Sequence, residues 1–255
     1  MISRAGFFNL FETELKNNIM KKTISVSNGA ATLDTNRRNF LKLSGVGLAL
    51  AGLTLVGCND DDFTMIDNGN VFDLGTGDVG VLNYAYALEQ LEADFYTKVV
   101  NNFYSGISAE EKQIFTDLYH HEVIHRDFFK AAIGGAAPNS ILPTLEFQYP
   151  GVNFSDRNSV LATAKALEDT GVAAYNGAGK YITNPDYLVL AGKIVSVEAR
   201  HAAAIRDLIS PRTAAFSGDD VINAMGLDLA KEPKDIVAAA GSFFKTPFTW
   251  KERGI

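Results

Sequence analysis

The sequence contains a single cysteine in 255 residues, which excludes a disulfide framework within the chain and zinc sites built from several cysteines. Basic residues are also scarce, at 23 against 30 acidic ones. The resulting net charge of −7 argues against nucleic-acid binding, which normally requires a basic surface. The composition, with 47% hydrophobic and 21% charged residues, excludes a disordered or collagen-like chain. It indicates a globular protein of one or two domains.

No hydrophobic run is long enough for a transmembrane helix. The most apolar stretch covers residues 43–57 and has only 15 residues, whereas a spanning helix needs roughly 20. It follows the sequence Arg37-Arg38-Asn39-Phe40-Leu41-Lys42. Paired arginines before a short apolar core resemble a twin-arginine export signal, and this resemblance implies export from the bacterial cytoplasm.

The apolar stretch ends in Leu55-Val56-Gly57-Cys58, which resembles a bacterial lipobox. The resemblance implies cleavage before Cys58, acylation of this residue and anchoring in the cell envelope, on the periplasmic side or at the surface. The alternative is that Cys58 is a small buried residue after a core helix. The segment before the arginines is unusually long for a leader, so translation starts either at Met1 or at Met20.

These features divide the chain into three parts. Residues 1–57 form a leader with a signal peptide, and residues 58–77 form a flexible acidic tether that begins with Asn59-Asp60-Asp61-Asp62. Residues 78–255 form the folded domain. The acidic run is either a solvated spacer or a signal for export to the outer surface.

The folded domain is predicted to be all-α, because its apolar residues recur at helical spacing and no segment alternates as a strand does. We expect four long helices and a short fifth one, at about residues 78–103, 108–133, 156–182, 185–209 and 233–244. Short turns join the first two helices and the next two, which makes two antiparallel hairpins. The 22-residue connection at 134–155 can run the length of a helix. Two hairpins with one long crossover form a ferritin-like four-helix bundle.

Each long helix carries a glutamate on its apolar face, and in two helices a histidine follows three residues later. The six residues are Glu89, Glu122, His125, Glu168, Glu198 and His201. An isolated buried carboxylate would cost several kcal/mol or become neutral. Metal cations would supply the compensating charge, and Glu-x-x-His spacing directs both side chains to one ion. The alternative is a set of core residues that form ion pairs without metal.

The four glutamates also lie at one height along the bundle. Glu89 and Glu122 lie 17 and 16 residues from Gly106 in the first turn, and Glu168 and Glu198 lie about 15 residues from the second turn. On the first helix Glu92 also faces inward. We favour Glu89 as the ligand, because Glu168 has the same neighbours and Glu92 aligns with a glycine. Glu92 is then an acid beside the ligands or in their access channel.

Four motifs on these helices resemble the ferritin-like superfamily of dimetal-carboxylate proteins, and within it the bacterial branch related to plant desiccation-associated proteins. They are residues 88–96, Glu122-Val123-Ile124-His125, Ala166-Leu167-Glu168 and Glu198-Ala199-Arg200-His201, with residues 223–229 as a further likeness. The resemblance implies Glu122 and Glu198 as terminal or bridging ligands, with Glu89 and Glu168 completing the shells. It also implies that Tyr96 and Tyr175 donate hydrogen bonds to the glutamates. We interpret His120 and His121 as surface or capping histidines; the alternative for His121, which lies four residues before His125, is a position at the edge of the site.

Carboxylates and imidazoles without sulfur suit two iron or manganese ions better than zinc or copper. The first hypothesis is a dinuclear oxidoreductase that reacts with dioxygen or hydrogen peroxide. The second is an envelope protein connected with stress or desiccation, whose metal site is only structural. A cage-forming iron store is disfavoured, because a lipid-anchored N-terminus is awkward in a closed shell. The sequence leaves the oligomeric state open, a dimer being one option.

Overall fold

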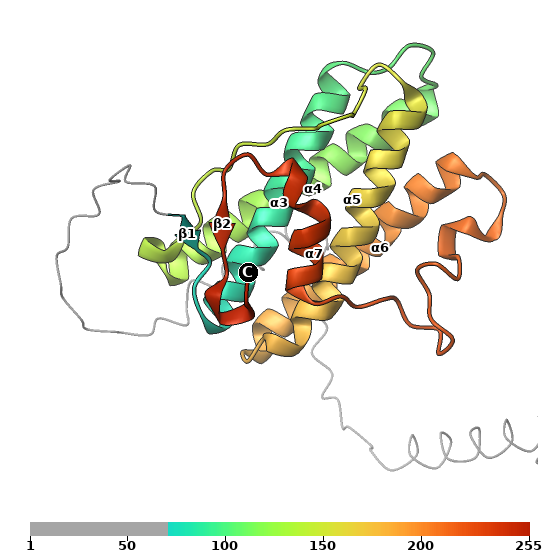
Figure 1. Cartoon of the computed structure of the whole chain (residues 1–255). Helices are drawn as coiled ribbons and strands as arrows, with labels where there is room; N and C mark the ends of the chain where they lie inside the picture. Colours follow the sequence, from blue (N-terminus) through green and yellow to red (C-terminus); the bar gives the residue numbers. More distant parts are fainter. Residues whose placement is uncertain (1–70) are drawn as a thin grey trace, which may run out of the picture. The chain divides into compact units, whose positions relative to one another are not determined.

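The computed structural model describes residues 71–255 and is mostly helical, as predicted (Figure 1). Its helices are α3 (Gly77–Asn101), α4 (Ala109–Ala136), α5 (Arg157–Ala178), α6 (Pro185–Ile209) and the short α7 (Pro233–Ala240). Short 3₁₀ turns extend the ends of α5 and α7, at Gly179–Tyr181 and Gly241–Phe243. The predicted export signal at Arg37 and Arg38 and the predicted lipidation site at Cys58 lie outside the described residues.

The starts of two helices follow local sequence signals. Ser108 caps α4: its hydroxyl accepts from the Glu111 backbone N–H, and the Glu111 carboxylate accepts from the Ser108 N–H, which completes a capping box. At α6, the Asn184 side chain accepts from the Asp186 N–H, and Pro185 occupies the first helical position. These caps fix the start of the two helices that carry Glu-x-x-His.

The four long helices form two antiparallel hairpins, α3–α4 and α5–α6, joined by the long connection between α4 and α5 (Figure 1). The connection runs along α3, where two buried side chains hold its backbone. Asn83 accepts from the Leu142 N–H, and Gln90 accepts from the Leu145 N–H and donates to the Pro143 carbonyl. The all-α ferritin-like bundle with one long crossover is therefore confirmed.

The packed structure begins before residue 78, where we expected the domain to start. Strand β1 (Phe72–Asp73) pairs in parallel with β2 (Phe248–Thr249), and this two-residue ladder is too short to show in sequence periodicity. Leu74 and Trp250 are fully buried beside it, and the Trp250 ring lies 5.2 Å from that of Tyr84. The C-terminal segment thus pairs with and packs against the beginning of the fold.

The segment between α6 and α7 crosses close over α5 before α7 packs against α5. The Lys231 N–H donates to the Ala173 carbonyl, and a Cβ on Gly177 would lie only 1.7 Å from the Lys231 carbonyl oxygen. Gly177 therefore allows an approach that a larger residue would block. Ile236 of α7 is fully buried in the core. Within residues 71–255, no helix is both long and apolar enough to cross a bilayer.

Candidate metal centre

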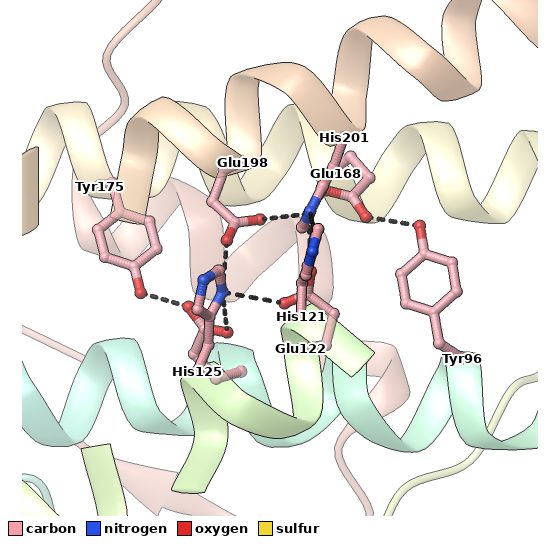
Figure 2. A network of polar contacts seen from close by, with 9 residues as sticks. Tyr96, His121, Glu122, His125, Glu168, Tyr175, Glu198 and His201 are labelled. Atoms are coloured by element: carbon pink, nitrogen blue, oxygen red, sulfur yellow. Dashed lines mark hydrogen bonds and ion pairs between the residues drawn. The ribbon is translucent and has the colours of Figure 1, made fainter. Parts of the chain in front are cut away.

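The six predicted ligands come together in the middle of the bundle, although they come from four helices (Figure 2). Glu89 lies on α3, Glu122 and His125 on α4, Glu168 on α5, and Glu198 and His201 on α6. All four glutamates are 0% exposed and His201 is 3% exposed, so the cluster lies inside the core. The predicted common height of the glutamates is thus realised in the fold.

The cluster consists of two overlapping sets of donor atoms. One set is Glu89, Glu122, His125 and Glu198, and the other is Glu122, Glu168, Glu198 and His201. Within each set, one atom from every residue lies within 4.8 Å of the others. Glu122 and Glu198 belong to both sets, which is the arrangement needed for two carboxylates to bridge neighbouring cations.

The shared carboxylates direct one oxygen to each histidine. Oε1 of Glu122 lies 2.7 Å from Nδ1 of His201, and Oε2 lies 3.5 Å from Nδ1 of His125. Glu198 is arranged in the opposite sense, with Oε1 at 2.9 Å from His125 Nδ1 and Oε2 at 3.5 Å from His201 Nδ1. Both histidines therefore present Nδ1 to the centre.

The two unshared glutamates are oriented by tyrosines on the opposite hairpin. Tyr96 of α3 donates to Oε1 of Glu168 on α5 at 2.5 Å, and Tyr175 of α5 donates to Oε1 of Glu89 on α3 (Figure 2). The remaining oxygen of each carboxylate faces the histidine of its own set, at 3.4 Å for Glu89 and 3.6 Å for Glu168. Each tyrosine thus fixes one carboxylate oxygen and leaves the other free to bind a cation.

The donor atoms lack hydrogen-bond partners, which supports a metal-binding role. In residues 71–255, twelve buried side-chain nitrogen and oxygen atoms have no hydrogen bond, and eight belong to these six residues. The contacts between the imidazole and carboxylate groups are short but not aligned as hydrogen bonds, so the atoms face a common space. Buried polar atoms without partners are costly, and a bound cation would satisfy them together. The residues present therefore fit a metal ion.

A family model for the ferritin-like domain matches residues 77–211. The chain belongs to the ferritin-like family. The matched segment spans α3 to α6 and contains all six residues of the cluster. A search of the curated proteins found no match. The ferritin-like bundle and a buried carboxylate–histidine cluster that can hold metal are thus properties of this chain.

In this ferritin-like protein without metal, protons take part in balancing the buried charge. Burial raises the pKa of Glu122, and the charge of Glu198 raises it further. Burial also raises the pKa of Glu198, but His125 and His201 outweigh it and hold the pKa at about 2. Burial lowers the pKa of His125, yet its glutamate contacts raise it to about 12, and Glu168 and Glu122 likewise raise the pKa of His201. A metal ion must displace protons from this cluster.

The structure places Glu92 outside both donor sets, although it is only 3% exposed. Its carboxyl lies against Gly171 of α5, where a Cβ would come within 3.0 Å of Oε1. Burial and then the charges of Glu198 and Glu168 raise the pKa of Glu92 well above its ordinary value. Burial and the neighbouring charges thus favour the neutral form of Glu92, which lies beside the cluster in a space that the glycine leaves open.

His121 is closer to the centre than the sequence indicated. It is exposed, as we expected of a surface histidine, but its Nδ1 lies 2.8 Å from Nε2 of His201 (Figure 2). Its position four residues before His125 was the only sequence signal for this contact. His120 is also exposed, and its ring packs beside Tyr119, at 5.1 Å between centroids.

Proposed function

We propose that this chain is an exported, lipid-anchored protein that binds two iron or manganese ions and reacts with dioxygen or hydrogen peroxide. The observation that carries the proposal is the sharing of Glu122 and Glu198 between two complete donor sets. Four carboxylates and two imidazoles without sulfur favour iron or manganese. Two such ions, held by these donor sets, would supply the redox equivalents for the reaction with a small oxidant.

The protein's own residues would hold the centre rigid and dry. His125 and His201 present Nδ1 as ligand atoms, while Tyr96 and Tyr175 fix the orientation of the outer carboxylates. The fully buried glutamates exclude bulk water from the ions. Burial raises the pKa of the Glu92 carboxyl, which makes it a candidate to donate or accept a proton beside the cluster.

Metal loading and oxidation test this function separately. The purified protein is loaded with Fe(II) or Mn(II) without oxygen, and metal per chain is measured before dioxygen or hydrogen peroxide is added. We expect close to two ions per chain and a spectral change with turnover on oxidation. The variant Glu122→Ala/Glu198→Ala should lose most of the metal, whereas Glu110→Ala, an exposed residue in the first turn of α4, should keep it. Well under one ion per chain in the unmodified protein would refute the proposal.

The complete burial of the glutamates favours a second candidate function. In a centre closed to substrates, the metal ions would only hold the four helices together. The protein would then be a structural envelope protein connected with stress or desiccation. Both functions require metal, so metal content does not separate them. If the loaded protein shows no spectral change with Fe(II) and dioxygen or with hydrogen peroxide, the structural function is the correct one.

The sequence motifs alone support export and anchoring. With Cys58→Ser the protein should leave the membrane fraction of the producing bacterium, and Arg37→Lys/Arg38→Lys should leave it in the cytoplasm. Fractionation followed by detection of the chain measures both outcomes. Membrane association that survives Cys58→Ser would contradict the anchor.

A further inference from the structure

The contact between His121 and His201 has the geometry of a hydrogen bond in the plane of both rings. The planes differ by only 12°, and the centroids lie 5.1 Å apart. With 2.8 Å between Nδ1 of His121 and Nε2 of His201, the centroid distance is close to this separation plus the two ring radii. The two nitrogens therefore point at each other, and the rings do not overlap face to face. Figure 2 shows the rings in line.

The direction of this hydrogen bond follows from what His201 does on its other side. Its Nδ1 faces Glu122, Glu168 and Glu198, so Nδ1 is the ligand atom of the donor set. An imidazole that binds a cation through Nδ1 carries its only proton on Nε2. A doubly protonated imidazole also carries a proton there. In either state His201 donates from Nε2, and Nδ1 of His121 accepts.

The equivalent interaction is missing in the other half of the centre. His125 and His201 are 76 residues apart, as are Glu122 and Glu198, so the position equivalent to His121 is residue 197. That residue is Val197, whose side chain cannot accept a hydrogen bond. The two otherwise matching donor sets thus differ in how their histidines are supported.

We infer that His121 is a positioning residue for one of the two metal positions: by accepting from Nε2 of His201, it fixes the tautomer and ring orientation in which Nδ1 binds the cation. This inference rests on the proposed dinuclear function. Outer partners of ligating histidines typically change metal affinity by 10- to 100-fold. Because His121 is exposed, it can be replaced with little effect on the core.

Three variants isolate this role. His121→Ala removes the acceptor, and His121→Asn restores one, since the Asn Oδ1 occupies about the position of Nδ1. His120→Ala is the matched control, as an exposed neighbouring histidine without contact to the centre. Zn(II), which is diamagnetic and binds the same donor atoms, is titrated against a competing chelator, and imidazole ¹⁵N spectra report the tautomer of His201 with and without zinc.

For His121→Ala we expect one of two zinc dissociation constants to rise about 10- to 100-fold while the other stays within a factor of three. His121→Asn and His120→Ala should match the unmodified protein. The hydrogen-bonded Nε2–H signal of His201 should vanish only in His121→Ala. Unchanged constants in His121→Ala, or equal weakening of both, would overturn the inference.

The spectrum of the metal-free protein separates the two possible failures. Absence of zinc and manganese binding in the unmodified protein refutes the proposed function. The inference about His121 fails by itself if the Nε2–H signal of His201 is absent in the unmodified metal-free protein or persists in His121→Ala. A protein that binds two ions while this signal is absent keeps its function and loses the positioning role.

Discussion

Without metal, the protein should lose stability as the pH rises above neutrality, because folding holds protons on His125 and His201. The pKa of His125 rises from an ordinary value of 6.5 to about 12 in the fold, and that of His201 also rises. A group whose folded pKa is raised contributes its full stability below the unfolded pKa and loses it as the pH rises towards the folded pKa. The relevant window therefore begins near pH 6.5 and extends towards pH 12.

The size of the effect follows from the number of protons. Each extra proton bound by the folded state lowers the free energy of unfolding by about 1.4 kcal/mol per pH unit in this window. The two histidines together give about 2.7 kcal/mol per pH unit, or about 5.4 kcal/mol over two units. Since small domains are stable by roughly 5–15 kcal/mol, the metal-free protein should be close to unfolding near pH 9–10.

Urea unfolding in the presence of a chelator, at several pH values above about 7.5, measures this slope. His125→Gln should reduce it by about 1.4 kcal/mol per pH unit, the contribution of one proton. His120→Gln should leave it unchanged, since His120 is exposed and outside the cluster. Saturation with zinc should remove most of the slope, because the ions replace the protons. A metal-free protein whose stability is flat between pH 7.5 and 9.5 would show that the buried histidines are neutral, and the reasoning would be wrong.

Three further outcomes follow from the geometry of the centre. Glu92→Gln should keep both ions and should raise the free energy of unfolding of the metal-free protein at neutral pH, because the buried amide needs no proton whereas burial and like charges disfavour the Glu92 carboxylate. Glu89→Gln should weaken the binding of one ion, and metal analysis compares the two variants. Tyr175→Phe and Tyr96→Phe should each weaken metal binding about 10- to 100-fold in chelator competition, and equal affinity to the unmodified protein would show that the hydrogen bonds to Glu89 and Glu168 do not matter. Loading with metal at 100 times each dissociation constant should stabilise the fold by about 3 kcal/mol per bound ion, or about 5 kcal/mol for two ions, in urea unfolding. No shift would mean that the folded state does not bind the ions selectively.

The helices and the convergence of the glutamates could be predicted from the sequence. The helices depend on the spacing of apolar residues, and the convergence depends on the number of residues between each glutamate and the nearest turn. An apolar stripe every three to four residues defines each helix, and an acid within the stripe must point into the bundle. With a rise of about 1.5 Å per residue, equal distances from a turn bring Glu89 beside Glu122 and Glu168 beside Glu198. Comparison of the two hairpins also favoured Glu89 over Glu92, and the structure keeps Glu92 outside both donor sets.

The features that the sequence did not reveal depend on contacts between distant segments. The pairing of β1 with β2 involves two residues on each side, too few for a periodic signal. The start of the fold, from β1 to Leu74, was therefore assigned to the tether. No sequence pattern indicates the burial of Trp250, because its contact with Tyr84 depends on where the C-terminal segment crosses the bundle. Helical spacing alone placed His121 only near the edge of the centre, and its hydrogen bond depends on the position of α6.

The two hairpins repeat the same arrangement of donors, yet they differ around them. Glu89 and Tyr96 of α3 correspond to Glu168 and Tyr175 of α5. In both cases the tyrosine of one helix donates a hydrogen bond to the glutamate of the other. The two hairpins differ at two pairs of equivalent positions. Glu92 of α3 corresponds to Gly171 of α5, against which it packs, and His121 of α4 corresponds to Val197 of α6. Neither difference removes a ligand atom, so both metal positions keep three glutamates and one histidine. The residues around the two positions differ in acidity and in hydrogen bonding. In the proposed centre the two ions should therefore bind with unequal affinity, since outer contacts set how tightly identical ligands hold a metal.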